Sequence, residues 1–527
     1  MKHRIPWSAL SAAVLLTGVA GAAPVDGRQV LTSTCAACHT PGADGKQPRI
    51  SDIRKTPEGW DMTIARMQVW HGVQISAEER RALVKYLADT QGLAPSETAA
   101  FRQGLERRPN VADHPPNDNL AQMCARCHSF ARVGLQRRDE GEWRKLVNTH
   151  LGQFPSIEYS LYGRDRDWFR IASTETAAEL GKLFPLQTEA WTTWHAHAPI
   201  DPSGRWRIAG ERPGSGRYSG VLTVQKAAAP DTYAARYEIE YADGRTLTGE
   251  SQALVYTGYE WREQGRLGDD AIRSVYALSE DGNGLSGRWF VKDADERGGE
   301  LHGTRIVDGR AGIVAVEPPF VRAGDTVEVT VAGFGLAGTP TLPAGVQLVG
   351  AAAGGPERLT LKLKVDAGAA DGWHPLKLGA AEARLGVYHK IDRVQVEPAY
   401  AVARVGGDGG PMPVVPAQFQ AIAWLDGADG KPGTDDDVRL GSVPASWRHE
   451  NHGEAAKDMQ DAQFAGRFAE AGLFQPGPAG LNPQRRFHTN NTGDLTVTAT
   501  VQDGAQTLEG QAQLMVTVQR WNNPPIK

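Results

Sequence analysis

Two copies of the pattern Cys-x-x-Cys-His carry the clearest chemistry in the sequence. In such a motif two thiols bond covalently to the vinyl groups of a haem, and the adjacent imidazole ligates the iron. All four cysteines of the chain fall inside the two motifs, so none remains for a disulfide. We therefore expect two covalently bound c-type haems. The attachment residues are Cys35 and Cys38, followed by His39, and Cys124 and Cys127, followed by His128.

A helical segment after each motif offers a second axial ligand for the iron. Trp60 precedes Met67 by seven residues, and Trp143 precedes His150 by the same interval. Seven residues are about two helical turns, which keeps each pair on one helix face. Aligning the tryptophans makes Met67 and His150 equivalent positions of an internal repeat. The predicted iron ligands are His39 and Met67 for haem 1, and His128 and His150 for haem 2.

Other side chains compete for the distal position of haem 1. His71 lies four residues after Met67, and Met62 lies five residues before it, near the same helical face. Ligation by His71 would make both haems bis-histidine. Met67 is favoured, and His71 and Met62 remain alternatives.

For haem 2 the rivals of His150 are His195 and His197. Both follow the last expected helix of the region, where a structural role is favoured. After Met123, beside the second motif, the next methionine is Met412, so no methionine is suitably placed. Because a thioether raises the iron potential relative to imidazole, we expect electrons to enter at haem 2 and leave from haem 1.

Each ligand-bearing segment is followed by an amphipathic stretch that predicts a terminal helix. These stretches are Ser76–Ala88 and Ser173–Phe184, and each opens with a serine and acidic residues that are typical of an N-cap. The repeat predicts an all-α dihaem cytochrome c domain over residues 23–186, with tandem units at about 23–95 and 110–186.

The first residues are typical of a secretory signal. A basic start at residues 2–4 precedes a short apolar run, and small residues follow at positions 20–22. We expect residues 1–22 to be cleaved and the mature chain to be periplasmic. The run is too short to span a bilayer, and no other stretch is long enough. The net charge of −5 argues against a nucleic-acid partner.

The remaining two thirds of the chain predict antiparallel β-structure. Residues 187–310 hold short alternating runs separated by glycine-rich turns, which favours a β-barrel. Residues 311–390 and 391–527 are each predicted as an immunoglobulin-like sandwich, and a shared Val-x-Val-Glu-Pro opening at Val314–Pro318 and Val394–Pro398 suggests that they are related.

Two further groups of residues could bind metal. The loop from Asp426 to Asp437 has five carboxylates that could supply oxygens to calcium, but it lacks the spacing of a helix–loop–helix site, and a solvated hairpin loop is favoured. A second group lies in irregular segments, where scattered surface side chains are the simpler interpretation. Its members are His449, Asn451, His452 and His488.

The chain resembles the alpha subunit, of about 60 kDa, of bacterial quinohaemoprotein amine dehydrogenase. The resemblance covers essentially the whole chain, and its most specific residues are the two haem motifs with Met67 and His150. It implies a periplasmic heterotrimer with a β-propeller subunit and a small subunit that carries a quinone. The quinone oxidises primary amines to aldehyde and ammonia. The dihaem subunit would pass the electrons to a soluble copper protein or cytochrome c, without itself catalysing amine chemistry.

Two other functions remain open on the sequence. A self-contained dihaem cytochrome c peroxidase is the main alternative, although it requires one haem with an open distal side. A carbohydrate- or surface-binding array with an attached cytochrome is the third. Partners that bear a quinone, peroxide turnover by the isolated chain, and glycan binding without partners would distinguish the three.

Overall fold

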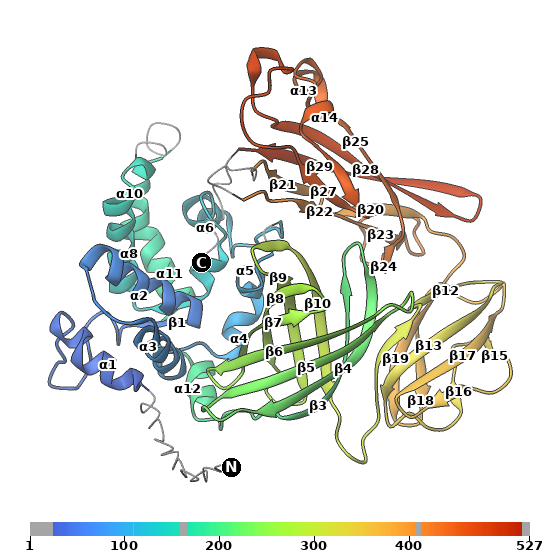
Figure 1. Cartoon of the computed structure of the whole chain (residues 1–527), viewed down its shortest axis with the longest axis horizontal. Helices are drawn as coiled ribbons and strands as arrows, with labels where there is room; N and C mark the ends of the chain where they lie inside the picture. Colours follow the sequence, from blue (N-terminus) through green and yellow to red (C-terminus); the bar gives the residue numbers. More distant parts are fainter. Residues whose placement is uncertain (1–24, 109, 159–165, 407–412, 519–527) are drawn as a thin grey trace, which may run out of the picture.

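A computed structural model describes residues 25–108, 110–158, 166–406 and 413–518 of the chain. The expected signal segment, residues 1–22, lies outside the described residues. A helical region comes first, an eight-stranded closed barrel follows, and two further β-rich regions complete the chain (Figure 1). The expected order of a helical region, a barrel and more β-sheet is confirmed.

The helical region consists of two similar halves joined by short helical turns. In each half a three-residue strand leads directly into the helix that carries the predicted distal ligand. The elements are α1 (Gly27–Ser33), η1 (Cys35–Ala37), β1 (Ile53–Lys55), α2 (Pro57–His71), α3 (Ala77–Thr90), α4 (Pro95–Thr98), η2 (Ala99–Phe101), α5 (Arg102–Leu105), α6 (Asp118–Cys124), α7 (Ala131–Gly134), β2 (Gln136–Arg138), α8 (Glu140–Gln153), α10 (Trp168–Ile171), η3 (Ala172–Thr176), α11 (Ala177–Leu183) and α12 (Glu189–His195).

Three local expectations need correction. Ser173 does not cap a helix, because the helix begins at Trp168 behind the Asp167 side chain and passes through a π-turn before α11. Helical structure does not stop at the expected boundary at residue 186, since α12 continues to His195. The region is also not purely helical, because β1 and β2 pair as an antiparallel ladder.

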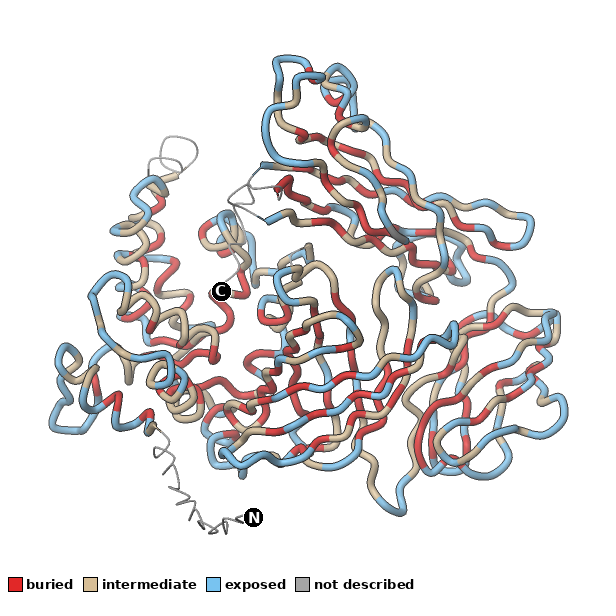
Figure 2. The backbone as a smooth tube through the Cα atoms, in the orientation of Figure 1, coloured by how far each residue is buried: buried red, intermediate tan, exposed pale blue. Residues whose placement is uncertain are grey.

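The barrel closes by pairing its last strand with its first. Every neighbouring pair is antiparallel. Buried and exposed residues alternate along most strands, as period-two side chains require (Figure 2). The strands are β3 (Gly204–Arg212), β4 (Gly216–Lys226), β5 (Thr232–Tyr241), β6 (Thr246–Tyr256), β7 (Glu260–Leu267), β8 (Asp270–Leu278), β9 (Gly284–Val291) and β10 (Ala294–Arg305).

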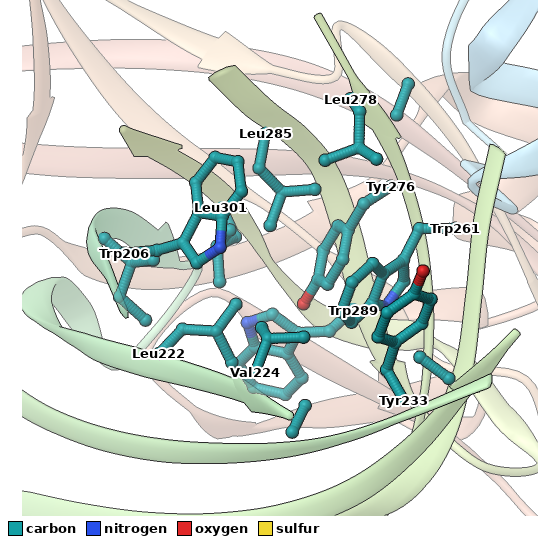
Figure 3. Packing of buried hydrophobic residues seen from close by; sticks show 14 of the residues in the cluster. Trp206, Leu222, Val224, Tyr233, Trp261, Tyr276, Leu278, Leu285, Trp289 and Leu301 are labelled. Atoms are coloured by element: carbon teal, nitrogen blue, oxygen red, sulfur yellow. The ribbon is translucent and has the colours of Figure 1, made fainter. Parts of the chain in front are cut away.

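Large aromatic side chains fill the barrel interior (Figure 3). Trp206 and Trp261 are fully buried, and Trp289 is almost so. Their indole nitrogens find partners inside the protein, such as the Glu263 carboxylate for Trp261 and the Tyr218 hydroxyl for Trp289. The barrel is therefore a packed core rather than an open channel.

The third region packs two sheets face to face around one aliphatic core. One sheet has the strand order β11-β13-β17-β15, with β16 beside β17, and the other has the order β12-β19-β18-β14. The strands are β11 (Gly312–Glu317), β12 (Phe320–Arg322), β13 (Thr326–Phe334), β14 (Pro340–Thr341), β15 (Val346–Leu348), β16 (Ala353–Gly355), β17 (Arg358–Val365), β18 (Gly372–Leu378) and β19 (Ala381–Tyr388).

In its described residues, the fourth region has three sheets and two short α-helices. Its opening repeats that of the third region, because β20 and β11 each lead into a strand that pairs in parallel with the last strand of the region. The elements are β20 (Arg393–Glu397), β21 (Tyr400–Arg404), β22 (Ala417–Gln418), β23 (Gln420–Leu425), β24 (Val438–Val443), β25 (Ser446–Asn451), α13 (Gly453–Asp458), α14 (Asp461–Phe464), β26 (Gly466–Glu470), β27 (Leu473–Pro476), η4 (Arg486–His488), β28 (Gly493–Asp503) and β29 (Gln506–Thr517).

Polar contacts fix the helical region on the barrel. The Asp89 carboxylate accepts a hydrogen bond from the Thr257 amide at 2.8 Å, and Arg262 of β7 contacts Glu58 at the start of α2. The barrel therefore supports the helix that carries Met67. Within the described residues, no helix is both long and apolar enough to cross a membrane.

Candidate haem-binding sites

The first attachment motif forms a tight helical turn. Cys35 lies in η1, and its carbonyl accepts hydrogen bonds from the Cys38 amide at 3.2 Å and the His39 amide at 2.9 Å. Cys35 is half-buried against the core of the first unit, whereas Cys38 is exposed. This turn gathers both thiols and the imidazole of the motif within one short segment.

The second motif begins at the last residue of α6. Cys124 packs partly into the core of the second unit, and Cys127 is exposed, so the two motifs share the same pattern of exposure. Burial raises the pKa of Cys124 to about 12, and burial also raises the pKa of Cys35. In each motif the first thiol therefore has an apolar setting that suits the edge of a porphyrin.

All three predicted iron-ligating histidines have the same ring nitrogen engaged by a backbone carbonyl. The Nδ1 atom of His39 lies 2.9 Å from the Pro48 carbonyl oxygen. The same distance of 2.9 Å separates His128 Nδ1 from the Ser129 oxygen and His150 Nδ1 from the Leu146 oxygen. A carbonyl only accepts, so each Nδ1 carries the proton and Nε2 keeps its lone pair. A haem iron is ligated through Nε2 of this tautomer. The three histidines are therefore suited to bind haem iron.

Burial favours the neutral form of both histidines of the second unit. Burial lowers the pKa of His128 to about 4, with Arg132 and His150 acting in the same direction. Burial also lowers the pKa of His150, and Arg66 and Arg132 add to this effect. Because only the neutral imidazole binds a metal, both rings are suited to ligation near neutral pH.

The two tryptophans used to align the repeat occupy equivalent positions. The Trp60 indole donates to the Gln91 carbonyl at 3.1 Å, and the Trp143 indole donates to the Phe184 carbonyl at 3.4 Å. Gln91 and Phe184 end the terminal helices α3 and α11, respectively. Met67 on α2 and His150 on α8 therefore each lie seven residues after a tryptophan that is held in the same way.

The three candidates for the distal ligand of haem 1 lie in different surroundings. Met67 is half-buried in α2, while His71 is the exposed last residue of that helix. The Met62 sulfur accepts contacts from Arg66 and from Arg132 of the second unit. Met62 thus contacts the junction between the units, and Met67 stays the predicted ligand.

For haem 2, the structure brings His128 and His150 into one neighbourhood. Burial lowers the pKa of His128, and the charge of the His150 ring lowers it further. His150 also lies beside Trp168, with ring centroids 6.5 Å apart. The rivals His195 and His197 are exposed and stack on tryptophans of α12, whose rings pack into the barrel core.

The acidic loop between β23 and β24 is closed by its own hydrogen bonds. Asp436 accepts the Ala428 amide and the Thr434 hydroxyl, and Arg393 pairs with Asp426 and Asp437. Among the described residues, no three His, Cys, Asp or Glu side chains gather in a way that could hold a metal ion.

The other possible metal ligands have hydrogen-bond partners within the protein. His449 contacts the Ala462 carbonyl, His452 contacts the Thr496 hydroxyl, and the Asn451 side chain accepts the Ala462 amide. His488 lies in the separate turn η4. The structure does not bring these residues together as one site.

A buried ion cluster between the two units was not predicted. Arg54 of β1 binds the Glu97 carboxylate through two hydrogen bonds of 2.8 and 2.9 Å, and Arg137 of β2 reaches the same carboxylate at 3.1 Å. Burial acts to raise the pKa of Glu97, but the hydrogen bond from Arg54 and the charges of both arginines bring it below its usual value. The only sequence signal is that Arg54 and Arg137 each stand six residues before the aligned tryptophans.

Comparison with protein families assigns the whole arrangement. Residues 25–191 match "Quinohemoprotein amine dehydrogenase A, alpha subunit, haem binding". Residues 200–306, 310–389 and 394–526 match domains II, III and IV of the same alpha subunit, in that order. The chain belongs to the quinohemoprotein amine dehydrogenase alpha-subunit family.

Membership of this family has three direct consequences. The haem-binding match encloses both Cys-x-x-Cys-His motifs together with Met67 and His150, so the helical region is a haem-binding region. The chain is a subunit of an amine dehydrogenase, which implies other subunits. The complex is therefore an oxidoreductase.

Other comparisons add little to the family assignment. No curated protein matches the chain significantly. A redesigned β-barrel, mFAP1, bound to DFHBI is 18% identical over 20% of this chain and 94% of that one, with a TM-score of 0.18. SGBP-B of the Bacteroides ovatus mixed-linkage glucan utilization locus is 11% identical over 59% of this chain and 60% of that one, with a TM-score of 0.16. At these TM-scores neither resemblance bears on function.

Proposed function

We propose that this chain is the dihaem electron-transfer subunit of a periplasmic amine dehydrogenase. It carries electrons from a quinone on a partner subunit to a soluble copper protein or cytochrome c. The partners are a β-propeller subunit and a small quinone-bearing subunit in a heterotrimer. The observation that carries the proposal is the pair of equivalent half-sites, each with a thiol pair and a histidine whose Nδ1 is held by a carbonyl.

Four thiols hold the haems covalently in this proposal. Cys35 and Cys38 attach haem 1, and Cys124 and Cys127 attach haem 2. Haem iron supplies reversible one-electron exchange when it is bound. The protein's own residues would fix the macrocycles, because the cysteines, the adjacent histidines and the carbonyls that hold each Nδ1 leave each ring little freedom.

The difference between the distal residues gives the transfer a direction. His39 and Met67 would hold the iron of haem 1, and His128 and His150 would hold that of haem 2. A thioether favours ferrous iron more than an imidazole does. Electrons therefore enter through the second unit and leave through the first.

The arrangement of the β-rich regions supports a scaffold role. We assign residues 187–310 to a barrel domain and residues 311–390 and 391–527 to two immunoglobulin-like sandwiches. The barrel holds α2 through Arg262 and Glu58, which fixes the distance between the first unit and the rest of the subunit. A rigid scaffold keeps haem edges close to an electron donor.

A redox titration of the native complex tests the ligand assignment. Met67→His replaces a thioether by an imidazole and is expected to move one of two midpoint potentials to a lower value. His71→Gln is the matched control on the same helix and should leave both midpoints in place. An unchanged pair of midpoints in Met67→His would refute Met67 as a ligand.

The identity of the complex is tested by mass spectrometry after purification of the complex from the periplasm. The expected result is two haem additions on this chain and a co-purifying subunit with a quinone-modified side chain. Absence of such a subunit would remove the amine dehydrogenase function for this chain. Peroxide turnover by the isolated haem-loaded chain would favour a dihaem peroxidase instead.

A further inference from the structure

Five cationic side chains gather at the junction of the two haem units. We name them the inter-unit cation cluster: Arg49, Lys55, Arg66, Arg132 and Arg138. Three come from the first unit and two from the second: Arg49 and Arg138 share the Glu142 carboxylate, and Arg66 and Arg132 share the Met62 sulfur. Burial lowers the pKa of Lys55, and the charges of Arg138, Arg66 and Arg49 lower it further. Lys55 and Arg138 are almost fully buried, so water does little to screen this concentration of positive charge.

The carboxylates nearby do not balance this charge. Glu142 is the shared counter-ion of Arg49 at 3.4 Å and Arg138 at 3.7 Å, and it also binds Lys145. In the described part of the chain, neither Arg66 nor Arg132 forms an ion pair with a carboxylate.

Other acids of the two units have partners of their own, and Asp52 accepts the Arg49 amide at 2.9 Å. Asp139 caps α8 by accepting the Glu142 amide at 2.7 Å, and Asp61 pairs with Arg80. Asp113 accepts the Ser129 hydroxyl at 2.8 Å and the Phe130 amide at 2.6 Å. The cluster therefore carries excess positive charge.

Arg66 and Arg132 converge on the same weak acceptor. The Arg66 guanidinium lies 2.9 Å from the Met62 sulfur, and the Arg132 guanidinium lies 3.4 Å from it. A thioether is a poor acceptor, whereas a guanidinium fork is matched to a carboxylate or phosphate. Two partly buried guanidinium groups on one sulfur indicate that an anion belongs between the units.

The position of these arginines identifies the anion. Arg132 lies in α7, four residues after the predicted iron ligand His128, and Arg66 meets Arg132 at the Met62 sulfur. The excess charge thus borders the predicted iron ligands of haem 2. A haem brings two propionate carboxylates to its site, and these are the anions that attachment at Cys124 and Cys127 would supply.

We propose that Arg66 and Arg132 bind the propionate carboxylates of haem 2, so that the first unit completes the haem site of the second. The inference rests on the ligand set proposed above. Arg66 is one residue from Met67, and the same short stretch of α2 therefore serves both haems. The two units are then functionally inseparable, because the second haem is held by a side chain of the first.

The charge has a consequence for electron transfer. Oxidised haem carries one more positive charge than reduced haem, so fixed cations close to the iron destabilise the oxidised form and raise the midpoint potential. In haem 2 this effect opposes the lowering by a second imidazole. Arg66 and Arg132 thus reduce the potential difference between the two haems.

Midpoint titration of the full-length, haem-loaded chain in its native complex tests the inference. His150→Met first marks the haem 2 step, because that substitution raises the midpoint of the haem that His150 ligates. Arg66→Gln and Arg132→Gln are each expected to shift this same step to lower potential. Arg66→Lys keeps the charge, so the midpoint of this step should stay close to that of the wild type. Arg144→Gln, on the exposed side of α8, is the matched control and should leave both steps in place.

The outcomes separate this inference from the ligand proposal. If His150→Met moves neither step, the assignment of His150 fails. If it moves one step, but Arg66→Gln and Arg132→Gln leave that step unchanged or move only the other step, the propionate inference is wrong. Haem absorption spectra of each variant show whether both haems remain attached, so a folding defect is recognised independently of the potentials.

Discussion

Glu97 balances two buried arginines that come from different haem units. The exposed fraction of its side chain is 5%, and those of Arg54 and Arg137 are 4% and 7%. Glu97→Gln would leave both guanidinium groups without a counter-charge in a site closed to water. We expect a loss of about 3–5 kcal/mol in the free energy of unfolding, measured with denaturant. Glu140→Gln breaks the exposed pair with Arg144 and should cost at most about 1 kcal/mol.

Glu260 predicts a pH dependence of stability. Burial raises its pKa from the ordinary 4.5 to about 7, with Arg262 opposing and Glu58 adding to the shift. A folded-state pKa above the unfolded value means that the folded form holds the proton more tightly. The contribution of Glu260 to stability is thus full below about pH 4.5 and is lost as the pH rises through about 7. Between pH 5 and pH 8, the free energy of unfolding of Glu260→Gln, measured with denaturant, should rise by roughly 1–3 kcal/mol relative to that of the wild type.

Glu58, on the other side of Arg262, serves as the control for this titration. Burial would raise its pKa, but the charge and hydrogen bond of Arg262 bring it below the ordinary value. The stabilisation from Glu58 is therefore lost as the pH falls, and Glu58→Gln should lose stability relative to the wild type as the pH rises through the acidic range. Parallel behaviour of the two variants would contradict the assignment.

At the level of elements, the caps of the ligand-bearing helices set where those helices begin. Asp139 caps α8 by accepting the Glu142 amide at 2.7 Å. Asp139→Ala removes this acceptor and is expected to lower the free energy of unfolding by about 0.5–2 kcal/mol in a denaturant titration. Asp139→Ser keeps a capping oxygen and should recover most of the loss. An equal loss in both variants would show that the charge of Asp139, rather than its hydrogen bond, is what stabilises α8.

The elements also show what the sequence could predict. Ser76 followed by Glu79 predicted the start of α3, and both halves of the capping box are present. The similar pattern at Ser173 was misleading, because the helix starts earlier at Trp168, and a π-turn carries it past the serine. Strands β1 and β2 were not predicted, since three residues show no periodicity and their partner lies more than 80 positions away.

For the whole molecule, alternating strands and glycine turns predicted the barrel, because its pairs are all between sequence neighbours apart from the closing one. The candidate iron ligands could likewise be predicted from motif spacing, because each set lies within a short stretch of the sequence. The inter-unit cation cluster and the Arg54–Glu97–Arg137 contact could not be predicted. They arise only when two repeats from distant segments dock, and charge alone does not indicate which lysines and arginines become buried.

Gly92 packs directly against the Thr257 side chain of the barrel. A Cβ there would lie 2.2 Å from the Ala88 carbonyl oxygen and 2.8 Å from the Thr257 side chain of the barrel. Gly92→Val should therefore push α3 away from Thr257 and weaken the interface, at a cost of about 1–3 kcal/mol or more.

In the wild type, unfolding followed by haem absorption and by the fluorescence of the barrel tryptophans should coincide. In Gly92→Val the haem transition should come first, whereas Gly355→Ala, which meets nothing within 4 Å, should keep both transitions together. Coincident transitions in Gly92→Val would mean that the two regions do not depend on this contact for their cooperativity.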